Sequence, residues 1–209
     1  MINVLAFSIL GYLLGSIPFG IFIGKISKGL DIRDYGSGNT GMTNVLRTVG
    51  LKSAFAVLIL DMSKSILSIL ITRVLTNSNS PELEVIAGLA SIVGHNWPIF
   101  AGFRGGKGIA TGWSGLFPLS WIAGLSATLV GIPIALVSGY MSLGSILGAA
   151  AGCITLIVLA TASSLPDVYA WYGIVGGIIV ISKHRDNISR LINRSESRLH
   201  FQEYFKRFK

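Results

Sequence analysis

The chain has 209 residues, of which 51% are hydrophobic and only 12% are charged, and its formal net charge is +8. An average soluble domain carries about 25% charged residues, so this composition excludes an ordinary soluble protein. The basic residues gather in two segments, 25–52 and 183–209, that flank apolar stretches, a placement typical of cytoplasmic membrane loops rather than of a nucleic-acid-binding surface.

The first half of the chain contains three apolar segments that predict membrane spans of about 20 residues each. Residues 1–24 carry no charge; they are too long for a signal-peptide core and are expected to remain in the mature protein. Residues 53–72 predict a second span, with Asp61 and Lys64 inside it. A polar loop, TNSNSPELE, then leads into a third span at residues 85–100.

The second half is almost free of charge between residues 109 and 182. Breaks are expected near Pro118, at residues 138–145 and at residues 164–167, where proline, serine or a single acid interrupts the apolar sequence. These breaks divide the stretch into four helices. The count is then seven spans for the whole chain, with five as the alternative.

The fold class predicted is therefore an all-α polytopic membrane protein with a single domain over residues 1–209. Because basic loops face the cytoplasm, seven spans place the N-terminus outside and the C-terminus in the cytoplasm. Residues 183–209 form a basic, partly amphipathic cytoplasmic tail. The small residues of GSILGAAAG, residues 144–152, predict closely packed helices.

A glycine-rich segment, GSGNTGMTNVLR, follows the first span at residues 36–47. Such a loop can point backbone N–H groups outward to bind an anion, and the fixed donors of a guanidinium suit a phosphate. An ordinary turn between helices explains the glycines alone equally well. The candidate site residues here are Ser37, Gly38, Asn39, Thr43, Asn44 and Arg47.

A second segment, GHNWPIFAGFRGGKG, follows the third span at residues 94–108. It is not a nucleotide-binding Walker A loop, because that loop needs glycine at position 101 and serine or threonine at position 108. A membrane anchor would explain the two basic residues but not the glycines. An anion-binding loop explains both, since glycines allow close backbone approach and a lysine supplies a point charge. The candidates are His95, Gly105, Gly106 and Lys107.

A third segment, HRDNISRL, follows the last apolar stretch at residues 184–191. If it is helical, His184 and Asn187 share one face, although such a segment is more often an interfacial anchor than a catalytic element. Asp61 and Lys64 are also three residues apart. They are expected to pair inside the membrane, in a role that is structural at least as readily as catalytic.

Four segments, GSIPFG, SGNTGMTN, GHNWPIF…GGKGIAT and HRDNISRL, together resemble the PlsY family of bacterial acyl-phosphate-dependent glycerol-3-phosphate acyltransferases. The resemblance implies a seven-helix enzyme of phospholipid synthesis in the cytoplasmic (inner) membrane, with its active site facing the cytoplasm. Such an enzyme transfers a fatty acyl group from acyl phosphate to the 1-hydroxyl of sn-glycerol 3-phosphate. The products are lysophosphatidic acid and inorganic phosphate, and neither acyl carrier protein nor acyl-CoA is the direct donor.

The resemblance also implies residue roles and requires no cofactor or metal. It assigns importance to Ser37 and Arg47, glycerol-phosphate binding to Gly105, Gly106 and Lys107, essential roles to His184 and Asn187, and a structural role to Glu196. The family often has glycine where this chain has Arg194. The general base is either His184 or a phosphate oxygen of the substrate, and Ser37 is expected to donate a hydrogen bond rather than act as a nucleophile.

Two other classes remain possible from sequence alone. A transporter of organic phosphates would suit the charged residues inside a span, but it predicts two similar halves, and the chain has no internal repeat. A non-catalytic membrane scaffold would tolerate the loss of Ser37 or Lys107. The sequence defines neither the acyl-chain preference nor the oligomeric state.

Overall fold

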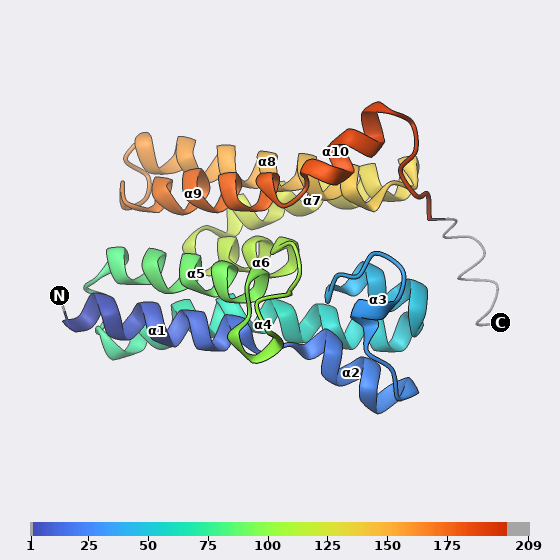
Figure 1. The fold of residues 1–209 in the computed structure, drawn as a ribbon. Helices are drawn as coiled ribbons and strands as arrows, with labels where there is room; N and C mark the ends of the chain where they lie inside the picture. Colours follow the sequence, from blue (N-terminus) through green and yellow to red (C-terminus); the bar gives the residue numbers. More distant parts are fainter. Residues whose placement is uncertain (1, 200–209) are drawn as a thin grey trace.

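The computed structural model describes residues 2–199 and is helical throughout them, with irregular connections (Figure 1). The α-helices are α1 (Ile2–Ser16), α2 (Phe19–Lys28), α3 (Met42–Thr48), α4 (Leu51–Leu75), α5 (Pro81–Asn96), α6 (Ile109–Leu119), α7 (Trp121–Ser138), α8 (Met141–Thr161), α9 (Tyr169–Ser182) and α10 (Arg185–Ile192). Two 3-10 helices, η1 (Ile32–Asp34) and η2 (Ile99–Ala101), lie in the connections.

Within residues 2–199, five helical segments are long and apolar enough to cross a membrane, namely Ile2–Lys28, Leu51–Leu75, Pro81–Ala101, Trp121–Ser138 and Met141–Thr161. The apolar stretch at 109–182 forms four helices, as predicted, with breaks after Leu119, at 139–140 and at 162–168. Two of the four are short: α6 has 11 residues and α9 has 14. At 1.5 Å per residue both are shorter than a bilayer core of about 30 Å, so seven spans remain a prediction.

The helices form two layers (Figure 1). One layer contains α1, α2, α4 and α5, and the other contains α7, α8 and α9. Helix α6 contacts α4 and α5 on one side and α7 and α8 on the other. The N-terminal end of α6 is enclosed by the protein, because Gly108 and Thr111 are buried.

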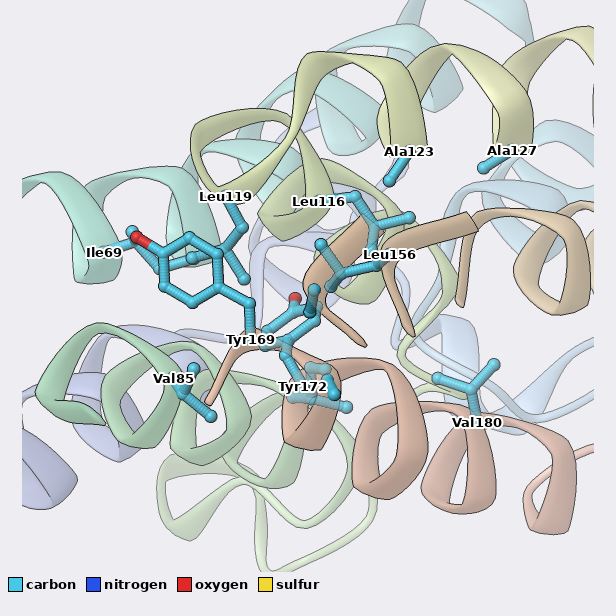
Figure 2. Close-up of a cluster of buried hydrophobic side chains, with 13 residues drawn as sticks. Ile69, Val85, Leu116, Leu119, Ala123, Ala127, Leu156, Tyr169, Tyr172 and Val180 are labelled. Atoms are coloured by element: carbon cyan, nitrogen blue, oxygen red, sulfur yellow. The ribbon is translucent and has the colours of Figure 1, made fainter. Parts of the chain in front are cut away.

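The main core lies where α6 meets both layers. Figure 2 shows Leu116 and Leu119 of α6 packed with Leu156 of α8 and Tyr172 of α9. Ile69 of α4 closes the cluster from the other layer. Full burial of a large apolar side chain contributes about 1.5–3 kcal/mol in water; inside a bilayer, close packing supplies much of the association between helices.

Glycines bring α7 and α8 into close contact, as the GSILGAAAG segment predicts. A Cβ atom at Gly148 would lie 2.8 Å from the Cα of Gly131 and 2.8 Å from the carbonyl oxygen of Ala127. Any larger residue at this position would push the two helices apart. The stripe of small residues is therefore a packing surface between helices.

Two helix boundaries differ from the prediction. The predicted first span is present as one apolar segment, Ile2–Lys28, but its helix is interrupted at Pro18, because proline removes a backbone donor, and α2 continues from Phe19. The TNSNSPELE loop ends at Ser80, and Pro81 opens α5 at a position that favours proline. Glu84 therefore lies in the first helical turn, is buried, and pairs with Arg73 at 2.6 Å. Tyr169 donates a hydrogen bond to the same carboxylate at 2.7 Å.

Candidate functional site

The three segments singled out by the sequence lie on separate elements that meet. The first forms the loop before α3, the second joins η2 to α6, and the third forms α10. Figure 1 shows α3 and α10 near the end of the bundle opposite to the N-terminus. Lys107 of the second segment hydrogen bonds to Asn187 of the third, and Arg33, just before the first segment, hydrogen bonds to Ala101 of the second.

Asn44 organises the first loop from within. Its side-chain Nδ2 donates to the carbonyl oxygens of Ile32, Tyr35 and Asn39 at 2.8, 3.1 and 2.9 Å. Its Oδ1 accepts a hydrogen bond from the backbone N–H of Ser37 at 2.9 Å. Asn44 is buried, so its amide holds the loop in shape, and its assignment to phosphate binding stays a prediction.

The other polar residues of this loop remain accessible. Ser37 and Gly38 are exposed, while Asn39 and Thr43 are half-buried. Ser37 Oγ accepts a hydrogen bond from Asn39 Nδ2 at 3.3 Å. Among residues 2–199, no histidine or carboxylate hydrogen bonds to this hydroxyl, so its proton is free for a ligand and no base is in place to make it a nucleophile.

Arg33 ties the first loop to the second and was missed by the sequence reasoning. Its Nη1 donates to the carbonyl oxygen of Ala101 in η2 at 2.9 Å. Its Nη2 pairs with Asp31 at 2.7 Å, and the hydrogen bond from Arg33 lowers the pKa of Asp31 to about 2. The pair is therefore charged at neutral pH.

The glycines of the second loop lie against His95. The backbone N–H of Gly106 donates to the carbonyl oxygen of His95 at 3.1 Å. A Cβ atom at Gly106 would overlap the imidazole Nε2 of His95, and one at Gly105 would overlap the His95 carbonyl oxygen. Both glycines are thus required where the loop passes the end of α5.

The intramembrane pair forms as predicted. Lys64 Nζ lies 2.6 Å from Asp61 Oδ1, and the two side chains are 3% and 2% exposed. Both lie beside His95, whose Nδ1 is 3.3 Å from Lys64 Nζ. The pair and the candidate phosphate-binding histidine are therefore one buried cluster.

Lys107 links the second and third segments. Its Nζ donates to Asn187 Oδ1. Burial lowers the pKa of Lys107, and the positive charge of Arg190 lowers it further. The residue stands directly before α6, whose first intrahelical bond runs from Gly112 N–H to the Gly108 carbonyl at 2.7 Å. The preceding N–H groups have no intrahelical acceptor, so the lysine and the positive helix end together favour an anion.

His184 precedes α10 instead of lying within it, and it is buried. Its Nδ1 lies 2.8 Å from the carbonyl oxygen of Val180. A carbonyl can only accept, so Nδ1 carries the proton and the neutral ring keeps a lone pair on Nε2. Burial lowers the pKa of His184, which keeps the ring neutral at neutral pH.

Glu196 is the centre of a hydrogen-bond network behind Lys107. Its Oε1 accepts from Asn187 Nδ2 at 2.8 Å and from Ser142 Oγ at 2.7 Å, and its Oε2 accepts from Arg190 Nε at 2.7 Å. Burial alone would raise the pKa of Glu196, but these hydrogen bonds outweigh it and the net pKa is lowered. The sequence indicated Asn187 and Glu196. It missed Arg190 and Ser142, the latter from α8.

The segment after α10 joins the two layers. Arg47 Nη2 donates to the Ser197 carbonyl at 3.4 Å, and Leu199 N–H donates to the Gly139 carbonyl at 2.8 Å. Leu199 is buried in an apolar cluster that includes Val45. A basic, partly amphipathic cytoplasmic tail is predicted over residues 183–209; its residues 195–199 contact the helices, and residues 200–209 lie outside the described part.

Arg194 occupies the turn that opens this segment. Its φ is +55°, in the left-handed region, where glycine is favoured. The substitution of arginine for the family's usual glycine therefore leaves the turn intact, with some backbone strain.

Comparisons with known proteins show the family to which the chain is related. Residues 5–194 match the family model described as glycerol-3-phosphate acyltransferase. A glycerol-3-phosphate acyltransferase of Shouchella clausii is 40% identical over 199 residues, which cover 95% of this chain and 97% of the relative. Glycerol-3-phosphate acyltransferase 3 of Dehalococcoides mccartyi is 42% identical over 201 residues, with 91% and 93% covered.

Two solved structures are also similar. One is a crystal structure of PlsY, an integral membrane glycerol 3-phosphate acyltransferase, in its glycerol 3-phosphate form, with a TM-score of 0.87 and 39% identity. The other is the lysophosphatidic acid form, with a TM-score of 0.85 and 38% identity. Each alignment covers 97% of this chain and 98% of the other.

Proposed function

Since the chain belongs to the glycerol-3-phosphate acyltransferase family, we propose that it transfers a fatty acyl group from acyl phosphate to the 1-hydroxyl of sn-glycerol 3-phosphate. The products are lysophosphatidic acid and inorganic phosphate. The observation that carries the proposal is the position of Lys107, at the N-terminal end of α6 and in contact with Asn187. Similarity to structures with glycerol 3-phosphate and lysophosphatidic acid supports both ends of the reaction.

The proposed acyl transfer depends more on the positioning of the two substrates than on activation of the bond that breaks. Acyl phosphate is a mixed anhydride, so the phosphate is already a good leaving group. The hydroxyl oxygen attacks the acyl carbonyl, the bond from the carbonyl carbon to the phosphate oxygen breaks, and the hydroxyl proton passes to a base. Lys107, Arg47, Ser37 and the free N–H groups in the first turn of α6 hold the two phosphates, while Asn187 orients Lys107.

Two groups can accept the hydroxyl proton. His184 offers the lone pair on Nε2, because Nδ1 is held by the Val180 carbonyl. A substrate phosphate offers an oxygen with a second pKa of about 6. Both are unprotonated at neutral pH.

Replacement of His184 by glutamine is expected to lower kcat by about 10²-fold, the effect of losing a general base. Because the pKa of His184 is lowered, a histidine base keeps the wild-type rate into mildly acidic pH and loses it only as pH falls through that lowered pKa. Single-turnover rates at pH 5–8 measure this. If His184→Gln keeps the wild-type single-turnover rate, and if that rate still falls as the pH drops below about 6, the base is the phosphate oxygen.

The proposed topology has seven spans, with α6 and α9 as the short ones, in the bacterial cytoplasmic membrane. The active site and C-terminus face the cytoplasm and the N-terminus faces outward, as the basic loops favour. We expect a membrane-impermeant thiol reagent on intact cells to label Asn79→Cys and not Ser195→Cys. Both positions are exposed in the structure. Labelling of Ser195→Cys and not of Asn79→Cys would show that the topology is the reverse of the one proposed.

Acyl transfer by the purified protein tests the activity directly. Palmitoyl phosphate and palmitoyl-CoA are offered separately with glycerol 3-phosphate, and lysophosphatidic acid is measured. The proposal expects product from the phosphate donor alone. Product from palmitoyl-CoA alone would overturn the donor assignment. No product from either donor with folded protein would return the organic-phosphate transporter to consideration.

A further inference from the structure

The buried cluster of Asp61, Lys64 and His95 takes no part in the reaction proposed above. Lys64 Nζ lies 2.6 Å from Asp61 Oδ1 and 3.3 Å from His95 Nδ1. His95 Nδ1 lies 3.6 Å from Asp61 Oδ1. Two residues of α4 therefore hold one edge of the imidazole of α5 and fix the direction of the opposite edge.

The opposite edge of His95 faces the glycine loop. Nε2 occupies the place where a Cβ of Gly106 would be. The Gly106 N–H is already donated to the His95 carbonyl at 3.1 Å, so this amide is not available to a phosphate. Gly106 therefore contacts His95 through both its amide and its Cα, and it stands directly before Lys107.

The same turn of α4 also holds the far side of the loop. Thr111 Oγ, in the first turn of α6, donates to the Asp61 carbonyl at 3.2 Å. Ser114 Oγ donates to the Met62 carbonyl at 2.8 Å. His95 before the loop and the first turns of α6 after it thus both contact one short stretch of α4, residues 61–64.

We propose that Asp61, Lys64 and His95 form a positioning cluster that sets the shape of the loop 105–108 and so places Lys107 for glycerol 3-phosphate. His95 then acts through the loop instead of touching substrate. Glycine is required at position 106 because the imidazole fills the adjacent space, not because a phosphate does. This inference rests on the proposed function.

This proposal and direct phosphate binding give different reasons for the glycine at position 106, and the difference can be tested. Gly106→Ala is expected to raise the KM for glycerol 3-phosphate or lower kcat/KM by about ten- to a hundredfold, as misplacement of a binding group does. In the double variant Gly106→Ala/His95→Ala the imidazole is gone and the new methyl group has room. The double variant should therefore recover several-fold over Gly106→Ala alone.

Gly105→Ala supplies the matched control. Its new methyl group would overlap the backbone carbonyl of His95, which His95→Ala retains. We expect Gly105→Ala/His95→Ala to be no better than Gly105→Ala. The proposal would be overturned if His95→Ala does not improve the kcat/KM of Gly106→Ala. It would also be overturned if His95→Ala improves Gly105→Ala and Gly106→Ala equally.

A second variant pair keeps the test independent of how well the double variants fold. Asp61→Asn/Lys64→Met removes both charges together, so neither is left buried without its partner. The expected result is a KM for glycerol 3-phosphate raised by about five- to tenfold, with kcat and the KM for acyl phosphate little changed. An unchanged KM for glycerol 3-phosphate, or an equal rise for both substrates, would contradict a role in placing the loop.

Wild-type protein separates this inference from the proposed function. If the wild type transfers no acyl group, the proposed function fails. If the wild type is active and the Gly106 background shows no recovery, only the inference fails.

Discussion

Replacement of Lys107 by methionine is expected to lower kcat/KM for glycerol 3-phosphate by about 10²–10³-fold, the effect of removing one preorganised group that stabilises charge in a transition state. Methionine keeps most of the volume of the side chain and removes the ammonium group. The hydrogen bond to Asn187 Oδ1 is lost with it. The variant therefore loses both the positive charge at position 107 and the contact that orients it. Steady-state kinetics with each substrate varied in turn measure the loss.

Arg104 provides the control for this prediction. It carries the same charge in the same loop, but it is exposed. Arg104→Met should change kcat/KM by less than about threefold, because exposed charges contribute little. Equal losses in the two variants would mean that loop charge in general attracts substrate. Full activity of Lys107→Met would show that the ammonium group of Lys107 is not needed for the reaction.

Replacement of Glu196 by alanine is expected to destabilise the protein and to inactivate the fraction that remains folded. The change removes the shared acceptor of Asn187, Ser142 and Arg190. Loss of one partner in such a network costs about 3 kcal/mol, which corresponds to a fall in Tm of about 6–12 °C for a chain of this size. Thermal unfolding in detergent measures the first effect.

Activity at a temperature where the variant is folded measures the second. Without Glu196, Asn187 is free to rotate, and kcat/KM should fall by about 10²-fold. Asp186→Asn is the control, because Asp186 is exposed and, within residues 2–199, pairs only with exposed Arg185 at 3.6 Å. A Glu196→Ala protein with a normal Tm and normal kinetics would show that the network does not position Lys107.

The sequence predicted the helices well because apolar runs and their interruptions are local properties. The breaks near Pro118 and after residues 138 and 161 follow from proline, glycine and serine within otherwise apolar sequence. The boundaries near Glu84 failed for a physical reason. An acid before an apolar run suggests a loop, yet carboxylates also favour the first turn of a helix, and Arg73 supplies a partner from another helix.

The site was predicted only in part, because its supporting contacts join distant residues. Ser142 lies among apolar residues of α8, and nothing in its neighbourhood indicates a bond to Glu196. Arg33 contacts a carbonyl group, which carries no sequence signal. Asn44 was assigned to a ligand, but an asparagine in a glycine-rich loop hydrogen bonds equally well to its own backbone.

The segment after α10 has a consequence for how the enzyme matures. Glu196 and Leu199 are among the last described residues to be synthesised, yet one orients Asn187 and the other packs against Val45 near the start of the chain. A nascent chain that has already inserted α1–α9 therefore lacks a finished active site. On the proposed function, we therefore expect chains that end before Glu196 to lack acyltransferase activity.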